Sequence, residues 1–320
     1  MDNLFDLIKE NKINEFSKLI NADNINIKDN FKNSLLHYAI KLNNFDVSDF
    51  LINKGININI SDKNNDSPLH ISVIMGKHNF VKLLLKNNAD INILNNKNKS
   101  PIFNACLKGD MYLVKLFIEN DCDLYLLDND NENILFNTVR SGNIELLDYL
   151  LNNTKLKVNS INYKKETLLH IAVLSNNYKM CEYLINKNIK THLLNNNLEN
   201  SLFYAVRQSN LEIIKLLIHH GSVLELKNKE GKNVLDISLE LKKHDILDYL
   251  NTSINSSKYI SYKEKYKIHY YLKCNDLYNA KSTYLSKKYT EEFDDKKYSI
   301  KELTEDLNLK EFLKFIYNNK

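Results

Sequence analysis

A small residue recurs along this chain at a nearly constant interval and in the same local setting each time. The seven copies are Ala39, Ser72, Ala105, Thr138, Ala172, Ala205 and Ser238, separated by steps of 33, 33, 33, 34, 33 and 33 residues. A period of this length is the signature of a repeat architecture, in which each unit contacts mainly its neighbours. The period therefore argues against a single globular core over most of the chain.

Each copy carries two apolar stretches at helical spacing. The first surrounds the small residue, as in SPLHIS and TLLHIA, and the second begins about six residues later, as in FVKLLLK and IELLDYLL. A polar, Asn-rich stretch follows. The pattern predicts a short helix, a tight turn, a longer helix and an extended polar loop. Because one such pair cannot bury its apolar face alone, we expect the pairs to stack.

In period and motif the chain resembles the ankyrin-repeat family, whose first helix opens with T-P-L-H-x-A. The resemblance covers residues 1–253 and implies an all-α ankyrin-repeat solenoid, built from stacked helix–turn–helix pairs with β-hairpin loops. A short helical C-terminal tail is expected at 254–320. The eight expected repeats are 1–29, 30–62, 63–95, 96–128, 129–162, 163–195, 196–228 and 229–253.

The glycines and prolines support this alignment. All six glycines fall where the family needs a positive φ, and Pro68 and Pro101 occupy the first helical turn. The hairpin glycine is replaced by Lys32, Lys165 and Leu198, and by Asn in other repeats. Because Lys and Leu adopt the left-handed conformation poorly, we expect altered turns there. The extra residue of the fifth repeat is expected to lengthen its loop.

The repeats offer little catalytic chemistry. His37, His70 and His170 take the histidine of the motif, and the resemblance implies that they hydrogen-bond the turn backbone and tie neighbouring repeats. The four cysteines are scattered without metal-type spacing, which is typical of a reducing compartment. Phosphate-loop, GxSxG and HExxH motifs are all missing. We therefore expect a protein that is not an enzyme and needs no cofactor or metal.

One acidic cluster needs a separate interpretation. Asp128, Asp130 and Glu132 resemble part of a calcium loop, but the glycine and the closing Glu of such a loop are missing. We interpret the cluster as a solvated hairpin tip.

A binding surface is the remaining expectation, since the family presents its first helices and hairpin tips on a concave face. The positions two and three residues past the small residue are unusually apolar there, with arginines beside them, as in interaction hot spots. The alternative is that these side chains merely pad the stack. Phe31 and Tyr163 add aromatic side chains at hairpin tips. The candidate partner-binding residues are Phe31, Lys41, Ile74, Met75, Leu107, Arg140, Tyr163, Leu174 and Arg207.

The tail differs from the repeats in composition. It holds 14 of the 44 basic residues and 10 of the 40 acidic ones, so the whole net charge of +4 belongs to it. Residues 258–289 contain eight Lys and eight Tyr, which suits RNA binding as well as a helix packed through its Tyr face. We expect a largely helical tail docked against the last repeat, with Leu309, Phe312, Leu313 and Ile316 on one buried helix face.

The N-terminal sequence and the composition indicate in which compartment the protein acts. The N-terminus lacks the basic start of a signal peptide, and no run of about 18 apolar residues exists. The abundance of Asn, Lys and Ile is typical of an AT-rich genome, such as that of a virus or a bacterium. We expect a cytoplasmic monomer, acting in the host cytoplasm if the source is a virus or secretes it.

Two functions remain open at this point. The first is a non-catalytic adaptor that binds an unidentified protein partner through the concave groove, without contact to a membrane. The second, less favoured, is a nucleic-acid-associated protein that uses the basic, Tyr-rich tail.

Overall fold

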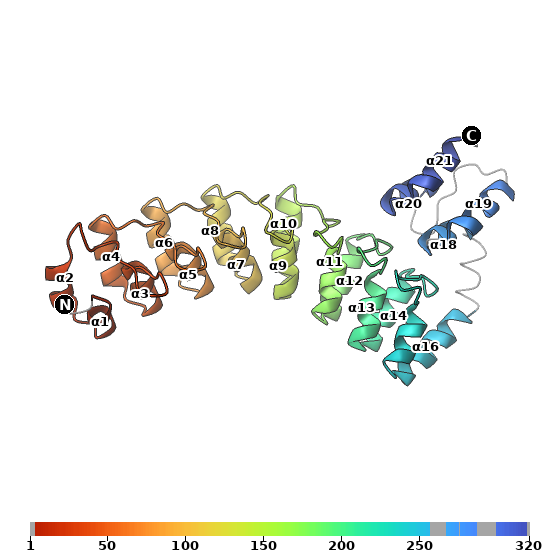
Figure 1. Ribbon diagram of the computed structural model, residues 1–320, viewed down its shortest axis with the longest axis horizontal. Helices are drawn as coiled ribbons and strands as arrows, with labels where there is room; N and C mark the ends of the chain where they lie inside the picture. Colours follow the sequence, from red (N-terminus) through yellow and green to blue (C-terminus); the bar gives the residue numbers. More distant parts are fainter. Residues whose placement is uncertain (1–3, 257–266, 275, 287–298, 319–320) are drawn as a thin grey trace. The chain divides into compact units, whose positions relative to one another are not determined.

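The computed structural model describes residues 4–256, 267–274, 276–286 and 299–318 (Figure 1). These residues form 20 helices, and their only β-structure is two isolated bridges, Lys28 with Ser34 and Ile161 with Thr167. The prediction of an all-α fold is confirmed. The chain forms two compact units, residues 1–156 and residues 157–320.

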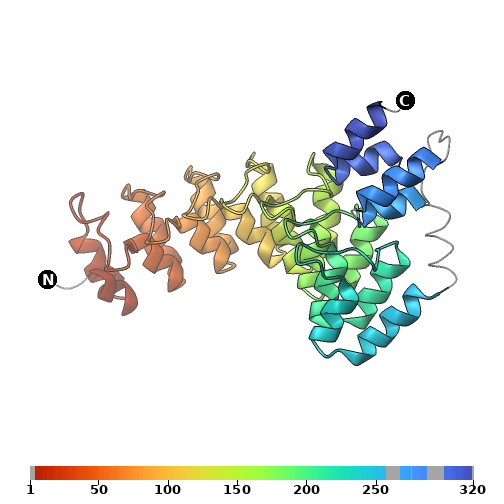
Figure 2. The same cartoon turned by 45° about the vertical axis from the view of Figure 1, so that its right-hand side comes forward.

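Helices come in successive pairs in both units (Figure 2). The pairs of unit 1 are α1 Leu4–Lys9 with α2 Ile13–Leu19, α3 Leu35–Lys41 with α4 Phe45–Asn53, α5 Pro68–Ile74 with α6 His78–Lys86, α7 Pro101–Lys108 with α8 Met111–Glu119, and α9 Ile134–Ser141 with α10 Ile144–Asn153. Unit 2 has α11 Leu168–Leu174 with α12 Tyr178–Asn186, α13 Ser201–Gln208 with α14 Leu211–His219, and α15 Val234–Glu240 with α16 His244–Ile254. Its C-terminal helices are α18 Lys267–Lys273, α19 Leu277–Ser286, α20 Ile300–Asp306 and α21 Lys310–Asn318.

Short polar side chains fix where the helices of each pair begin. Ser67 caps α5 by accepting a hydrogen bond from the backbone N–H of His70, and Pro68 takes the first helical position. The second helix of a pair often starts in the same way, as where Asp110 caps α8. The small residues of the period, such as Ala39 and Ala172, are fully buried. Within each unit the first helices therefore pack against one another as well as against their own second helix.

Three buried histidines each tie their own repeat to the next one. The Nε2 atom of His37 lies 3.1 Å from the backbone oxygen of Asp66, 29 residues further on, while its Nδ1 accepts from the backbone N–H of Ser34. The same arrangement recurs at His70 and His170. A neutral ring protonated on Nε2 satisfies both contacts. The inter-repeat role that the resemblance implied for these histidines is therefore present.

The hairpin turns are alike whether or not they hold glycine, so the expectation of altered turns at Lys32, Lys165 and Leu198 was wrong. All three residues have a φ of about 60° (61°, 60° and 60°), close to the 75° of Gly231. The reason lies three residues earlier, where an Asp or Asn side chain accepts backbone hydrogen bonds. Asn162 Oδ1, for example, accepts from the N–H groups of residues 164 and 166. This turn holds the left-handed residue in place in spite of its steric cost.

The extra residue of the fifth repeat lies in a helix, and the expectation of a longer loop was also wrong. Helix α10 has 10 residues where α6, α8 and α12 have nine. The loops before α9 and α11 both span 14 residues. Helix α10 also ends differently, because the Thr154 hydroxyl donates to the backbone oxygen of Leu150 in place of a left-handed closing residue. The hydroxyl satisfies a carbonyl that a left-handed cap normally would.

The C-terminal helices have a hydrophobic core of their own. Helices α18, α19, α20 and α21 bury Ile268, Leu272, Ala280, Ile300, Leu303, Phe312 and Ile316 together, with Leu309 partly buried beside them. Leu313 is half-buried. The helical character expected of the tail therefore holds for its described residues. Much of the Lys- and Tyr-rich stretch, including 258–266, lies outside the described residues.

These helices contact the repeats at an unexpected place. Asp306, at the end of α20, accepts hydrogen bonds from Lys190 and His192 in the loop after α12, with 3.2 Å between His192 Nε2 and the carboxylate. Leu239, on the outer flank of the last repeat, stays 60% exposed. Among its described residues, the tail thus contacts the sixth repeat through a polar contact, whereas the sequence predicted docking against the last repeat.

The buried histidines predict a pH dependence of stability. Burial lowers the pKa of His37 and of His170 to about 4, and it also lowers the pKa of His70. In the unfolded chain these rings titrate near 6.5, so the unfolded state binds more protons between pH 6.5 and 4. Stability should be full above pH 6.5 and fall as the pH is lowered to 4, by about 3 kcal/mol for a histidine shifted this far.

Thermal unfolding at pH 4 to 7.5 checks this dependence. The variant His170→Gln should start less stable than wild type and lose less stability as the pH falls, and His219→Gln, which replaces an exposed histidine, serves as the control. Identical slopes in all three proteins would contradict the assignment.

The strained hairpin residues predict a stabilising substitution. Lys165 is exposed and has a φ of 60°, so glycine removes the steric cost without removing packing. We expect Lys165→Gly to raise the free energy of unfolding by about 0.5–1 kcal/mol. Lys97→Gly, one position earlier in another hairpin and without a positive φ, should lower it. Urea denaturation of both variants measures the difference, and a stabilised Lys97→Gly would refute the explanation.

Candidate partner-binding surface

Unit 1 exposes a row of apolar side chains at the ends of adjacent first helices. Leu42, Ile74, Met75 and Leu107 are 45%, 40%, 42% and 44% exposed. We call these four residues the unit 1 apolar row. They lie at the C-terminal ends of α3, α5 and α7, which pack side by side, and Val73 and Cys106 beside them are fully buried. The row therefore faces away from the contacts between repeats.

The candidate cations are bound within their own repeats. Arg140 donates two hydrogen bonds to Glu132, at 2.6 and 2.7 Å, and Arg207 donates two to Glu199, at 2.8 and 2.5 Å. Lys41 reaches Asn33 in the same way, again eight residues earlier, at 2.6 Å. Each arginine thus uses the two N–H groups that could bind a partner's carboxylate for a contact inside the protein. What remains for a partner is the outer edge of side chains that are 34% and 41% exposed.

The acceptor in one such pair shows how strong the contact is. Burial alone would raise the pKa of Glu199, but hydrogen bonds from Arg207 and Asn228 outweigh it and hold the pKa below its usual value. Glu132 is likewise only 3% exposed. The interpretation of Asp128 and Glu132 as a solvated hairpin tip was therefore wrong, because both side chains are buried and paired with cations.

Where the first helix carries an apolar residue at this position, its hairpin finds other partners. Asp66, eight residues before Ile74, accepts from Asn95 of the next hairpin at 2.8 Å. Lys99, eight before Leu107, pairs with Asp128 at 3.2 Å. The hairpins of unit 1 are thereby braced to each other. Ile74 and Leu107 stay exposed at the ends of their helices.

Unit 1 also exposes apolar residues that were not among the candidates predicted from the sequence. Leu94 and Leu127 are 36% and 48% exposed and lie 33 residues apart, each directly before a hairpin. Asn65 donates to the backbone oxygen of Leu94 at 3.0 Å, which holds that segment beside the preceding hairpin. An apolar residue in an otherwise polar loop was the signal that could have identified them.

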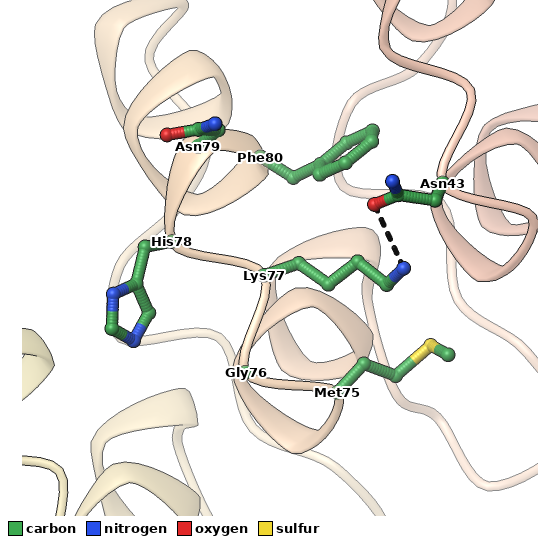
Figure 3. A pocket seen from close by; sticks show the side chains of 7 residues that line it. All are labelled: Asn43, Met75, Gly76, Lys77, His78, Asn79 and Phe80. Atoms are coloured by element: carbon green, nitrogen blue, oxygen red, sulfur yellow. Dashed lines mark hydrogen bonds between the residues drawn. The ribbon is translucent and has the colours of Figure 1, made fainter.

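Met75 also lines a surface pocket of about 380 Å³ at the turn between α5 and α6 (Figure 3). The other lining residues are Asn43, Gly76, Lys77, His78, Asn79 and Phe80. The side chains of Met75 and Lys77 extend in the same direction, and Lys77 donates to Asn43 of the neighbouring repeat at 2.8 Å. The apolar row therefore continues into a hollow with a polar rim.

The remaining candidates belong to different parts of the chain. Phe31 in unit 1 and Tyr163 in unit 2 are 59% and 55% exposed, and Lys63 Nζ lies 4.9 Å from the centre of the Phe31 ring. Leu174 is 43% exposed and belongs to unit 2 with Arg207. Six of the nine candidate residues therefore lie on unit 1, and the other three lie on unit 2.

Little in the described residues suggests catalysis. Within these residues, no group of three His, Cys, Asp or Glu side chains is placed to hold a metal ion. Burial raises the pKa of Cys106 and of Cys181 to about 12, so neither thiol is a ready nucleophile. Nor does any described helix have the length and apolar character needed to cross a membrane.

The family follows from comparison with known proteins. A family model for ankyrin repeats (3 copies) matches residues 4–95 and 102–195. The chain belongs to the ankyrin-repeat family. The resemblance to ankyrin repeats that the sequence indicated is confirmed. Ankyrin repeats generally mediate protein–protein interactions. No significant match was found among curated protein sequences.

Solved ankyrin structures resemble the chain. The human ASB11 ankyrin repeat domain is 27% identical, with a TM-score of 0.56, and the match covers 64% of this chain and 92% of that one. The ankyrin repeat domain of Bcl-3, a member of the IkappaB family, is 20% identical, with a TM-score of 0.53 and coverage of 64% and 93%. The second likeness concerns the fold alone.

The arginine pairs predict a stability effect. Removing one partner of a buried ion pair costs about 3–5 kcal/mol, but the Arg207 side chain is 41% exposed, so we expect Arg207→Ala to cost about 1–2 kcal/mol. Lys215→Ala breaks an exposed pair with Glu212 and should change stability little. Chemical denaturation compares the two variants. Equal losses would mean that Arg207 is no more important to the fold than a surface lysine.

Proposed function

We propose that this ankyrin-repeat protein is a non-catalytic adaptor that holds a partner protein on unit 1. The observation that carries the proposal is the unit 1 apolar row. Leu42, Ile74, Met75 and Leu107 are each 40–45% exposed on neighbouring first helices. Contiguous apolar surface of this kind usually has a binding use. Burying the exposed part of each side chain is worth about 1 kcal/mol.

The surroundings of the row support specific binding. Lys41 and Arg140 are held in place by Asn33 and Glu132, so their outer edges are presented with little freedom to lose. Phe31 adds an exposed aromatic ring on the same unit. In this proposal Tyr163, Leu174 and Arg207 offer further contacts on unit 2. The partner is a protein, and the adaptor works as a monomer in the cytoplasm of its cell or of a host cell.

The nucleic-acid alternative depends on the Lys- and Tyr-rich stretch 258–289. Residues 258–266 and 287–289 of that stretch lie outside the described residues. Within its described part, Lys273 is 4% exposed, which does not favour contact with phosphates. The adaptor role is therefore the one we put forward.

A pair of substitutions tests the adaptor role. In the double variant Met75→Asp, Leu107→Asp, binding a partner would require burying two unpaired carboxylates, so we expect capture from the lysate of the source or host cell to fall at least tenfold. Because both side chains are exposed, the melting temperature should stay close to wild type. The measurement pairs partner capture with thermal unfolding.

Two further variants serve as controls. Leu84→Asp places a carboxylate at a residue that is 1% exposed and should unfold the repeat. Leu239→Asp adds the same charge at an exposed leucine of the last repeat and should leave capture unchanged. Full capture by the Met75→Asp, Leu107→Asp protein would show that the row is not the binding site.

A further inference from the structure

Two adjacent first helices of unit 1 carry asparagines with unused hydrogen-bonding capacity. Asn104 on α7 and Asn137 on α9 lie 33 residues apart, one position before the small residue of their repeats. The side-chain nitrogen of each is sealed from solvent and has no hydrogen-bond partner among the described residues. Asn137 as a whole is only 2% exposed. Buried polar groups in folded proteins are normally paired, so these two amides need an explanation.

Stacking does not explain them, because other repeats fill the same position without leaving a polar group unpaired. Ile71, Ile171 and Ile237 occupy it in three repeats and are 7%, 3% and 6% exposed. Tyr204 occupies it in another, where its hydroxyl donates to Glu166 at 2.6 Å. The chain thus has an apolar solution and a satisfied polar solution for this position. The two asparagines use neither.

The contacts of Tyr204 show where a side chain at this position points. Its hydroxyl bonds Glu166 in the hairpin of the preceding repeat and Asn195 in its own hairpin. By repeat equivalence, Asn104 and Asn137 point toward the hairpin bases of unit 1. Asn104 also lies three residues before Leu107 on α7, so the two side chains share one face of that helix. The amides therefore lie on the floor of the same surface.

The polar groups around this floor are already occupied by one another. Asp66 accepts from Asn95, and Lys99 pairs with Asp128. Arg140 donates two hydrogen bonds to Glu132 of its own repeat. The charged side chains around the floor are thus paired with one another. A ligand that carries a carboxylate or a phosphate would find no unpaired cation among these groups. A neutral hydrogen-bonding ligand suits it better.

We propose that this surface binds an extended peptide segment, whose main-chain amides pair with Asn104 and Asn137 while its apolar side chains pack on Ile74, Met75 and Leu107. The inference deepens the adaptor role proposed above and rests on it. The ligand class follows from the chemistry of the two side chains. A primary amide offers both a donor and an acceptor, as a peptide group does.

Spacing favours an extended chain over a helix. Packed helices lie about 8–10 Å apart, and an extended chain advances about 3.3 Å per residue, so main-chain groups three residues apart match amides on neighbouring helices. A helical ligand has already bonded its main-chain groups internally. It would leave both asparagine amides without a partner, as they are in the free protein. The extended segment is the ligand that uses both amides.

The experiment uses the full chain and a defined probe. Twelve-residue peptides displayed on phage are selected on the protein, and the tightest binder is synthesised with and without N-methyl groups at successive main-chain positions. N-methylation removes one N–H and keeps every side chain. We expect one or two N-methyl groups, about three residues apart, to weaken binding at least tenfold, while N-methylation elsewhere has little effect.

The matched variant is Asn104→Ile, Asn137→Ile, which installs the residue found at this position in three other repeats. This variant should bind the parent peptide at least tenfold more weakly than the wild-type protein does. It should bind the parent peptide and the sensitive N-methylated peptides with equal affinity. Its melting temperature should equal or exceed that of wild type, because two unpaired buried amides are removed. A lower melting temperature with unchanged peptide affinity would assign the asparagines a structural role and overturn the inference.

The outcomes separate this inference from the adaptor role. If Met75→Asp, Leu107→Asp loses partner capture while the isoleucine variant and every N-methylated peptide bind normally, the adaptor role stands and the extended ligand is refuted. Failure to select any linear peptide, with protein capture still dependent on Met75 and Leu107, would have the same meaning. If the aspartate variant captures its partner fully, both proposals fall.

Discussion

Within each unit, neighbouring first helices pack through an apolar residue that lies one position past the small residue of the repeat. Val73 and Val206 are fully buried in this way, whereas Leu239 in the last repeat is 60% exposed. The burial of these residues fixes the distance between neighbouring first helices, and the histidine bonds to the next hairpin fix their register. The hairpins, the groove and the outer helices are all positioned by this contact.

The same stacking leaves some positions free to differ between repeats, and binding properties arise there. Two residues past the small residue, the chain places Arg207 in one repeat, where it is bound to a buried Glu199, and Leu107 in another, where it is exposed. Both fit the same backbone. Thus one repeat stiffens its hairpin and another offers apolar surface. Asn104 and Asn137 are a second example of a position that differs between repeats. Their side-chain nitrogens are unpaired, whereas the same position in another repeat holds the buried Ile71.

The fold could be predicted from the sequence because stacking imposes a period, and the glycines and prolines mark its turns. Local departures could not, because their compensations involve other residues. The turn at Lys165 is kept by hydrogen bonds to Asn162, and the extra residue of the fifth repeat is absorbed by α10. For the site, the exposed positions were predictable from the period. The engagement of Arg140 with Glu132 was not, since the two residues are eight apart and meet only once the hairpin is folded.

The contact between Asp306 and the loop after α12 gives the chain a topology that a simple stack lacks. Most contacts in a solenoid join neighbouring repeats, but Lys190 and Asp306 are 116 residues apart in sequence. The bond closes a long loop around the last repeats, and forming such a loop costs entropy and slows folding. Helices α13 to α16 lie in sequence between the two residues that this contact joins, so we expect it to oppose their separation from the sixth repeat. Among the described residues, α1 makes no comparable long-range polar contact that an ion pair or side-chain hydrogen bond shows, so we expect fraying to be easier from the N-terminal side than from the C-terminal side.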